Sequence, residues 1–203
     1  MNDQIELVVF DLFGTLFQYS VRHHPFDQIL RAAKDGGRKP RADDARILMT
    51  TGGRIEDIFA ALDILPSKEQ LNEFSQLVGL ELEGLSLFDD VSETLTALQD
   101  QGKKIAICSN LAQPYGKALN VLLPNLNALI FLSYEVGLIK PEFGIYQWIE
   151  DQSGICRNKT LFIGDTYEAD YKGPIEFGFK AKHLVRNKPT SVDQIRSLLE
   201  IIQ

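Results

Sequence analysis

The sequence predicts an α/β fold in which a Rossmann-like, doubly wound parallel sheet forms the core and carries a small α-helical cap domain. Three features support this prediction. A short apolar run at residues 7–10 is typical of a strand buried on both faces. Residues 17–87 follow helical spacing. From Phe88 onward strands and helices alternate, which is the pattern of a parallel sheet.

The first strand ends in a charged turn. The apolar run stops at Asp11, and Gly14 permits a tight turn directly after it. A carboxylate at the carboxyl end of a buried parallel strand points into the crevice where open α/β sheets bind ligands. On this local pattern alone, Asp11 is equally compatible with a capping role in the turn.

Four helices are expected in the segment that follows. The first has one apolar face, the second covers residues 42–49, and the third follows Gly53. Ser67 and Gln70 have capping-box spacing and predict the start of the fourth. Such a bundle, inserted after the first strand, is expected to lie over the strand ends. We therefore predict a core of residues 1–16 and 88–203 and a cap of residues 17–87. The apolar faces of the first, third and fourth helices comprise Phe26, Ile29, Leu30, Ala33, Ile55, Ile58, Phe59, Leu62, Leu71, Phe74, Leu77 and Val78.

The remaining chain alternates between the two element types. Gly102 ends one helix, Pro141 is expected in the first turn of another, and Ser191 with Gln194 forms a capping box that predicts a C-terminal helix. The predicted strands are residues 104–108, 129–132, 160–163 and 181–185, and the two helices with clear limits are residues 90–101 and 114–123.

Composition and charge narrow the class of protein. A hydrophobic content of 44% is ordinary for a globular chain, and no apolar run is long enough to cross a bilayer. A formal net charge of −7 argues against a nucleic acid as partner, because binding its backbone needs a basic surface. We expect a small-molecule substrate and no membrane partner. The oligomeric state is not determined by these features.

The cysteines and the N-terminus indicate the compartment. Cys108 and Cys156 lie in neither a CxxC pair nor a zinc-type cluster, so both are expected to be reduced. The first four residues are polar and acidic and do not resemble the basic start of a signal peptide. We therefore expect a cytoplasmic protein.

Polar side chains follow several of the predicted strands, and one parallel sheet would bring them to a single edge. Two of them, Asp11 and Asp165, could hold a divalent cation through carboxylate oxygens. A lysine and a hydroxyl nearby would hold a phosphate-like anion. Asp11 would then be a nucleophile that attacks phosphorus and forms an aspartyl intermediate. The complete set is Asp11, Thr15, Ser109, Asn110, Lys140, Asp165 and Asp170.

This set resembles the haloacid dehalogenase superfamily of hydrolases, of the type whose helical cap lies between the first and second motifs. The resemblance covers nearly the whole chain, and each motif has the strand context that the family expects. The four motifs are matched in order by Asp11 with Thr15, by Ser109 with Asn110 beside it, by Lys140 before Pro141, and by Gly164-Asp165 through Asp170.

The resemblance implies a role for each matched residue. Asp11 would be the nucleophile, with Ser109 and Lys140 as phosphate-holding catalytic groups. Thr15 and Asn110 would contact the substrate. The cofactor would be Mg²⁺, bound by Asp11, Asp165 and the backbone carbonyl of Phe13. Asp170 would act through a water molecule or by orienting Lys140.

The chain departs from the family at one position. Phosphatases of the family carry a second aspartate two residues after the nucleophile, which protonates the leaving oxygen and later activates water. Phe13 stands at that position and can do neither. The loss of a general acid–base group typically lowers the rate about a hundred- to ten-thousand-fold.

Three hypotheses follow from this departure. The first is a magnesium-dependent phosphohydrolase that uses another proton donor, with His23 and His24 as candidates, or a substrate with a good leaving group. The second is a metal-independent 2-haloacid dehalogenase. Such enzymes also have an apolar or aromatic residue at the Phe13 position, but a neutral one at that of Asp165, and Arg38 or Arg41 would bind the halide. The third is a weakly catalytic protein that binds a phosphorylated ligand.

A variant of the first hypothesis comes from phosphonoacetaldehyde hydrolases. These enzymes also lack the second aspartate and keep magnesium, but they use a small residue at the Phe13 position and a cap lysine, for which Lys34 and Lys39 are candidates. A buried acidic cluster is costly unless it binds a cation or a proton. The acidic pair at 165 and 170 therefore favours the magnesium-dependent phosphohydrolase over the alternatives.

Overall fold

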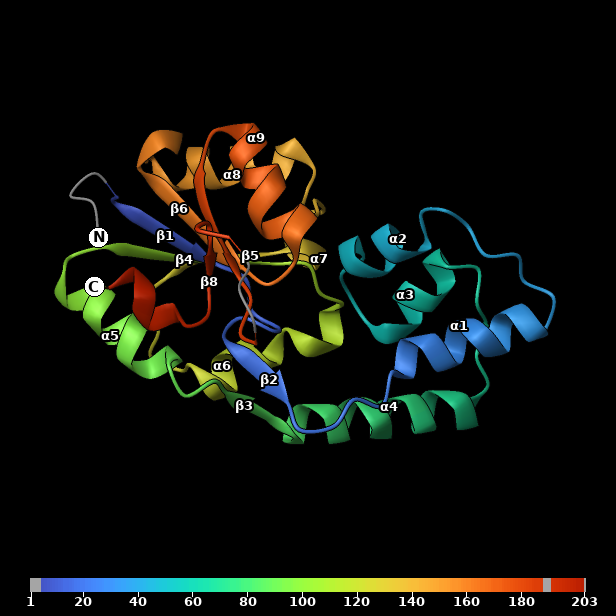
Figure 1. Ribbon diagram of the computed structural model, residues 1–203. Helices are drawn as coiled ribbons and strands as arrows, with labels where there is room; N and C mark the ends of the chain where they lie inside the picture. The colour runs from blue at the N-terminus through green and yellow to red at the C-terminus, as the bar shows by residue number, and fades with distance from the viewer. Residues whose placement is uncertain (1–4, 188–190, 203) are drawn as a thin grey trace.

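The core of the protein is a parallel sheet, as the sequence predicts, and it has six strands where the sequence predicts five. The computed structural model describes residues 5–187 and 191–202 (Figure 1). The strand order is β5-β4-β1-β6-β7-β8, so β1 lies inside the sheet and the chain winds outward from it in both directions. The strands are β1 (Leu7–Phe10), β4 (Lys104–Ser109), β5 (Leu129–Leu132), β6 (Thr160–Gly164), β7 (Lys180–Leu184) and β8 (Gln194–Ile195).

Strand β1 is apolar throughout because both of its faces are covered. It pairs with β4 on one side and β6 on the other, and all four of its residues are fully buried. Leu7 and Val9 pack into one apolar cluster, whereas Val8 and Phe10 point to the opposite face and pack into another. Because both faces of β1 are buried in apolar clusters, the strand does not alternate between apolar and polar residues.

Helices cover the two faces. Helices α8 and α9 lie on one face of the sheet, and α5 and α6 lie on the other (Figure 1). The buried side chains of α8, such as Tyr146 and Ile149, belong to the same cluster as Val9. The helices and 3₁₀ turns of this part are α5 (Val91–Asp100), η1 (Gln113–Tyr115), α6 (Lys117–Leu122), α7 (Ser133–Val136), α8 (Phe143–Ser153), η2 (Arg157–Lys159), α9 (Gly173–Phe177) and η4 (Leu198–Ile201).

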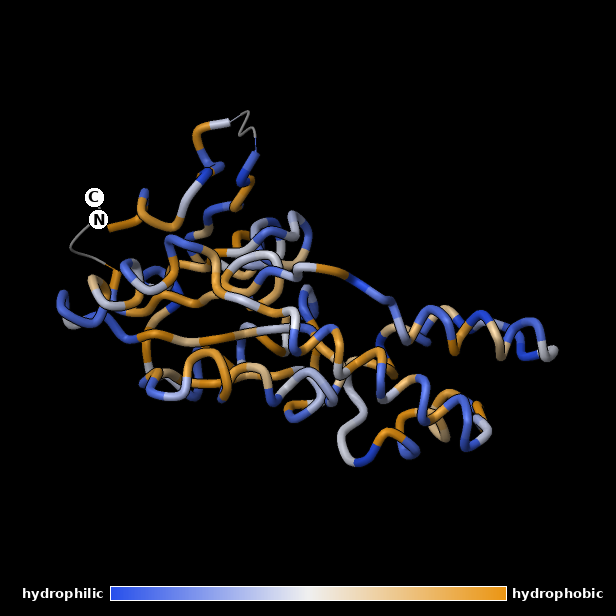
Figure 2. The backbone as a smooth tube through the Cα atoms, turned by 90° about the horizontal axis from the view of Figure 1, so that it is seen from below, coloured by the Kyte–Doolittle hydropathy of each residue, from blue (hydrophilic) through white to orange (hydrophobic). Residues whose placement is uncertain are grey.

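The segment between β1 and α5 forms a helical bundle at one end of the molecule (Figures 1 and 2). Its interior contains Phe26, Phe59 and Phe74, whose rings meet edge to face at centroid distances of 4.8 Å (Phe26–Phe74) and 5.2 Å (Phe59–Phe74). The capping box predicted at Ser67 is present, because Ser67 Oγ accepts from Gln70 N and Gln70 Oε1 accepts from Ser67 N. The bundle comprises α1 (Pro25–Asp35), α2 (Asp44–Thr50), α3 (Ile55–Ala61) and α4 (Lys68–Glu83).

A two-stranded antiparallel ribbon connects the bundle to the sheet. Strands β2 (Phe17–Tyr19) and β3 (Leu85–Leu87) pair with Phe17 opposite Leu87. The prediction that helical structure begins at residue 17 and continues to residue 87 is therefore wrong at both ends. A three-residue strand is too short for periodicity to detect, and its pairing partner lies far along the chain. The division into a core and a cap at these positions stays a prediction.

The predicted C-terminal helix is also wrong. The segment that was expected to start at Ser191 instead adds β8 beside β7, with His183 opposite Gln194 and Leu184 opposite Ile195. The open edge of β7 offers unpaired backbone groups, which a short extended segment can satisfy. The chain then turns into η4, where the Ser197 hydroxyl accepts from the backbone N–H of Leu199.

Two further helix boundaries differ from the prediction. Helix α8 begins at Phe143, because a turn closed by the bond from Glu142 N to Ile139 O places Pro141 before the helix. The predicted helix over residues 114–123 is divided into η1 and α6, which meet at Gly116. Within the part of the chain that the structure describes, we find no helix with the length and apolar character needed to cross a membrane.

The capping box of α4 provides a test of the bundle's local stability. Replacing Ser67 by Ala removes the acceptor for Gln70 N, so we expect the free energy of unfolding to fall by about 1 kcal/mol. Ser75→Ala is the matched control, because the Ser75 hydroxyl only donates to the Leu71 carbonyl within the same helix and alanine favours the helix interior. Equal effects of both variants in urea unfolding would contradict a capping role for Ser67.

Candidate active site

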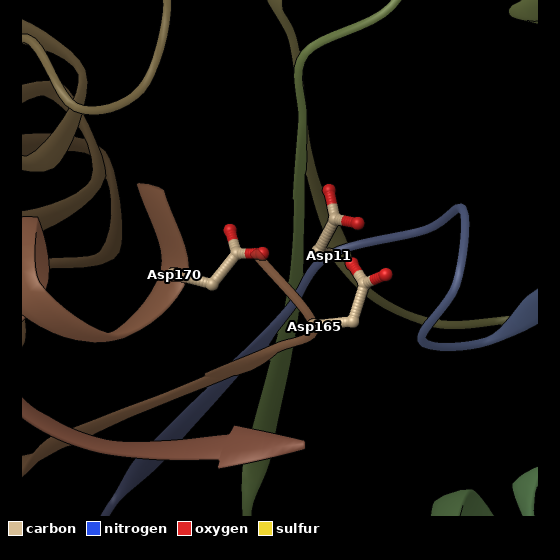
Figure 3. Close-up of side chains that lie close together, drawn as sticks. All are labelled: Asp11, Asp165 and Asp170. Carbon is tan, nitrogen blue, oxygen red and sulfur yellow. The ribbon is translucent and has the colours of Figure 1, made fainter. Parts of the chain in front are cut away.

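Three carboxylates meet at the carboxyl edge of the sheet. Asp11 follows β1, Asp165 follows the neighbouring strand β6, and Asp170 lies one turn further on, within a π-helical segment (η3, Tyr167–Lys172). One oxygen from each of the three residues lies within 4.8 Å of the others. Figure 3 shows the side chains facing a common space beyond the strand ends. The structure thus brings together residues that lie more than a hundred and fifty positions apart in the chain.

Lys140 links two of these carboxylates. Its Nζ donates to Asp11 Oδ1 at 2.8 Å and to Asp170 Oδ1 at 2.6 Å, and the lysine is only 3% exposed. The backbone of Lys140 is held by Asn110, whose side-chain amide donates to the Lys140 carbonyl and accepts from its N–H, both at 2.8 Å. Asn110, predicted to contact the substrate, therefore also positions the lysine.

Asp170 is fixed by a second set of contacts. Its other oxygen, Oδ2, accepts from the backbone N–H of Thr166 at 2.9 Å, and the Asp170 N–H donates to the Thr166 carbonyl. The carboxylate is buried and engaged on both oxygens. This geometry agrees with one of its two predicted roles, the orientation of Lys140.

The pKa values of the site reflect burial first and neighbouring charges second. Burial raises the pKa of Asp11 to about 6; the charge of Lys140 opposes this rise, Asp170 adds to it, and Ser109 opposes it. The pKa of Asp165 is also raised, first by burial and then by the charge of Asp11. For Lys140, burial favours the neutral form, but the two carboxylates outweigh it and raise the pKa above its ordinary value.

Two glycines make room for the carboxylates. A Cβ on Gly14 would lie 2.1 Å from Oδ2 of Asp165, and its φ of +86° is a conformation that other residues rarely adopt. A Cβ on Gly164 would lie 2.3 Å from Cγ of Asp170. The turn after β1 and the end of β6 can therefore approach the acidic side chains only because these positions carry no side chain.

The residues present fit a divalent cation. Three carboxylates face one lysine, so two negative charges remain when all are ionised. Mg²⁺ prefers oxygen ligands and typically uses one or two carboxylates, with water completing its coordination. Asp165 is available to bind the cation, because the ammonium of Lys140 contacts Asp11 and Asp170 but not Asp165.

The roles of all the predicted site residues stay predictions, and the structure shows where the remaining three of them lie. Ser109 is buried at the end of β4 beside Asp11. Thr15 is fully buried, and its hydroxyl has no hydrogen-bond partner among the described residues. Phe13 lies in the turn after β1, where its backbone carbonyl could bind a metal. Its ring lines a cavity, which its position in the sequence did not reveal.

The Phe13 ring forms one wall of a cavity of about 250 Å³ between the sheet and the bundle. It stacks on Tyr19 at a centroid distance of 5.3 Å and meets Tyr115 edge to face at 6.0 Å. Asn110, which holds the Lys140 backbone, lines the same cavity, so two of its lining residues lie close in the chain to Asp11 and Ser109. We call it the Phe13 pocket; its lining residues are Phe13, Tyr19, Arg22, His24, Pro25, Phe26, Asp27, Leu48, Met49, Glu81, Asn110, Leu111, Ala112 and Tyr115.

Most of the bundle residues that were predicted as proton donors, halide ligands or catalytic lysines do not line the Phe13 pocket. Arg38 donates to Asp44 and to the Leu62 carbonyl, and Arg41 forms an ion pair with Asp63. These contacts engage both arginines within the bundle. Lys34, Lys39 and His23 are likewise outside the lining, whereas His24 belongs to it.

Sequence reasoning missed one residue beside the acidic cluster. His183 lies on β7, next to β6, and its Nε2 is 2.9 Å from the backbone carbonyl of Asp165. The side-chain amide of Gln194 lies 3.3 Å from Nδ1, which assigns the proton to Nε2 and makes the histidine a donor to that carbonyl. Only its place near the end of a strand could have indicated this contact.

Comparisons with known proteins agree with this geometry. The family model of haloacid dehalogenase-like hydrolases matches residues 5–178. Because this match covers most of the chain, the protein belongs to the haloacid dehalogenase-like hydrolase family, as predicted from its motifs. A comparison with curated proteins found no match.

Solved structures with the same fold include both hydrolase types. A dehalogenase is 21% identical, with a TM-score of 0.65 and coverage of 99% of this chain and 97% of that one. A HAD phosphatase from Thermococcus onnurineus is 21% identical, with a TM-score of 0.64 and coverage of 97% and 96%. The HAD family enzyme bt-2542 from Bacteroides thetaiotaomicron, in complex with magnesium and inorganic phosphate, is 18% identical, with a TM-score of 0.62 and coverage of 92% and 98%. At these identities the similarity shows the fold alone.

Gly14 provides a test of the close approach to Asp165. Gly14→Ala adds both left-handed backbone strain and a clash, whereas Gly37→Ala adds strain alone, because its φ is +99° and nothing lies within 4 Å of its Cβ position. We expect Gly37→Ala to lower the free energy of unfolding by about 1 kcal/mol, the cost of holding a residue other than glycine in a left-handed conformation. Gly14→Ala should lower it by clearly more in urea unfolding. Equal losses would show that the turn can move away from Asp165 without cost.

Proposed function

We propose that the protein is a magnesium-dependent phosphohydrolase that acts on a small phosphorylated metabolite through an aspartyl intermediate. The observation that supports this most directly is the acidic cluster, in which the buried Asp11 and Asp170 share Lys140 and the exposed Asp165 has a carboxylate oxygen within 4.8 Å of theirs. Such a cluster leaves uncompensated negative charge, which is costly unless a cation is bound. Phosphoryl transfer needs a cation and a lysine at the same place, because the transferred group carries negative charge.

Each residue has a role in this proposal. Asp11, Asp165 and the Phe13 carbonyl would hold Mg²⁺, which supplies charge neutralisation at the phosphoryl oxygens. Asp11 attacks phosphorus, and Lys140 and Ser109 bind the phosphoryl oxygens. Asp170 keeps Lys140 directed at Asp11, as its 2.6 Å contact indicates. The relative that was solved with magnesium and inorganic phosphate supports this reading of the shared fold.

A 2-haloacid dehalogenase is the second candidate. The aromatic Phe13 favours it, because a halide leaves without a proton, and one similar structure is a dehalogenase. Two observations oppose it. Asp165 stands where dehalogenases have a neutral residue, and the predicted halide-binding arginines, Arg38 and Arg41, are engaged within the bundle.

Two remaining proposals concern turnover and location. Because position 13 carries no carboxylate, the protein could instead bind a phosphorylated ligand with little turnover. Ligand-induced thermal stabilisation without product release would support that hypothesis.

We place the protein in the cytoplasm, and its two cysteines, which are both free, support this location.

Product release distinguishes the candidates. The protein is incubated with a panel of phosphate monoesters and with 2-chloropropionate, each with and without Mg²⁺, and free phosphate and chloride are measured. We expect phosphate release that requires Mg²⁺, because the acidic cluster cannot be neutralised by Lys140 alone. Chloride release without metal would instead show a dehalogenase.

Variants identify the groups responsible. Asp11→Asn should abolish turnover, because an amide cannot form the phosphoryl intermediate, and retained activity would remove Asp11 as the nucleophile. Asp165→Asn should raise the Mg²⁺ concentration needed for half-maximal rate at least tenfold. Asp89→Asn is the matched control, because Asp89 is exposed and lies outside the cluster.

The raised pKa of Asp11 predicts how metal binding depends on pH. A proton and Mg²⁺ compete for this carboxylate, so its pKa of about 6 means that the metal-free site is protonated below pH 6 and ionised above it. From pH 7 to pH 5 the dissociation constant for Mg²⁺, measured by calorimetry, should rise about tenfold. An unchanged constant over this range would show that Asp11 does not bind the ion. Asp11→Asn should bind more weakly and with a flatter pH dependence.

A further inference from the structure

The Phe13 pocket begins where the acidic site ends. Phe13 lies two residues after Asp11, and Asn110 follows Ser109 directly while holding the backbone of Lys140. Both residues line the pocket. A phosphoryl group bound beside Asp11 and Lys140 could therefore direct its remaining substituent toward this pocket. The pocket is in the right place to receive the leaving group of a phosphate ester.

The walls nearest the site are aromatic. The planes of Phe13 and Tyr19 are 18° apart, and Tyr115 presents an edge to Phe13 at an interplanar angle of 80°. The ring centroid of Phe26 lies 6.4 Å from that of Tyr115. Ring faces and edges in these orientations bind another planar ring by offset stacking and edge-to-face contacts. A cavity of about 150 Å³ is known to accept benzene, so the 250 Å³ here is enough for one substituted ring.

The tyrosines of the pocket are poor proton donors. Tyr115 already donates its hydroxyl hydrogen to the buried carboxylate of Glu81. Burial, together with this bond and the charge of Glu81, raises the pKa of Tyr115 well above its usual value. Burial and the charge of Glu81 also raise the pKa of Tyr19. Neither phenol can readily replace the aspartate that is absent at Phe13.

The charged groups around the pocket are not suited to protonate the leaving group either. Glu81 accepts from the backbone N–H groups of His23 and His24 as well as from Tyr115, which engages it as an acceptor. The guanidinium of Arg22 lies over the ring of Tyr19 at 4.9 Å and cannot give up a proton at neutral pH. His24 remains, but its side chain is exposed, and Nδ1 lies 3.4 Å from the exposed carboxylate of Asp27.

From this geometry we infer that the substrate is an aryl phosphate or a similar ester, whose planar leaving group binds in the Phe13 pocket and departs as an anion without receiving a proton from the enzyme. This inference rests on the proposed phosphohydrolase function. A phenol has a pKa of about 10, as in tyrosine. The pKa of bulk water, 15.7, approximates that of a simple alcohol. A phenolate is therefore a far better unprotonated leaving group, and only the alcohol needs the missing general acid.

The reaction balances without an acid at position 13. An Asp11 carboxylate oxygen forms a bond to phosphorus while the bond between phosphorus and the aryl oxygen breaks, and the electron pair leaves with the phenolate. Water then attacks the aspartyl phosphate and releases the Asp11 carboxylate. One hydrogen of that water remains on the inorganic phosphate, and the other reaches the phenolate through solvent. The aromatic wall and the absent carboxylate are thus two consequences of one residue, Phe13.

A series of phosphate monoesters tests the inference. Phenyl, benzyl and cyclohexyl phosphate have rings of similar size, but only phenyl phosphate loses a phenolate. We expect kcat/KM for phenyl phosphate to exceed that of both other esters at least a hundredfold, which is the lower end of the contribution of a general acid. Values within tenfold of one another would overturn the inference, because they would show that the enzyme supplies a proton.

Variants show whether the enzyme lacks a general acid or uses a proton donor other than the residue at position 13. Phe13→Asp should raise kcat/KM for benzyl phosphate more than for phenyl phosphate and so reduce their ratio at least tenfold, whereas Phe13→Leu should leave the ratio high. His24→Asn should also leave the ratio unchanged; Asn tolerates the left-handed backbone found at His24, where φ is 53°. If His24→Asn increases the ratio at least tenfold, His24 is the proton donor and the inference is wrong.

Two further measurements separate pocket binding from turnover. Phenylphosphonate, which has no leaving group, should inhibit at least tenfold more tightly than methylphosphonate, and equal inhibition would overturn the assignment of the pocket. Acetyl phosphate has a good leaving group that is too small to need the aromatic walls. If acetyl phosphate is hydrolysed with Mg²⁺ but phenyl phosphate is not preferred over benzyl phosphate, only this inference fails. If none of these esters releases phosphate, the proposed function fails as well.

Discussion

The ammonium of Lys140 between Asp11 and Asp170 is the interaction on which the site depends. All three groups are buried, so removing Lys140 would leave two carboxylates without a countercharge in a medium that solvates them poorly. The pair of bonds joins the end of β1, the loop before α8 and the segment after β6. Asn110 adds the end of β4 by holding the lysine backbone. Through its ammonium and its backbone, Lys140 thus connects four segments at the carboxyl edge of the sheet.

Phe13 and Glu81 connect this site to the helical bundle. Phe13 belongs to the turn after β1, but its ring packs on Tyr19 of β2 and against Tyr115 of η1. Glu81 of α4 is buried and accepts from the start of the bundle and from Tyr115. A buried carboxylate with several donors fixes geometry strongly, because each donor would otherwise be left without a partner. The same contacts therefore shape the pocket and attach the bundle to the sheet.

The long elements could be predicted from local patterns, but the short strands could not. The apolar run of β1, the capping box at Ser67 and the alternation after Phe88 are local patterns that the backbone obeys. The ribbon of β2 and β3 and the added strand β8 depend on partners far along the chain, so no local pattern reveals them. The capping-box spacing at Ser191 predicted a helix, but the open edge of β7 offered backbone hydrogen bonds to the same segment.

The sequence by itself determined the family and the residues that meet at the strand ends, because motif order and strand context are properties of the linear chain. It also showed that Phe13 replaces a carboxylate. Only the tertiary structure decided what Phe13 does instead, that Arg38 and Arg41 are engaged within the bundle, and that His183 contacts the backbone of Asp165. Those contacts join residues from separate elements. They depend on how helices and strands pack, which periodicity and spacing along one chain do not encode.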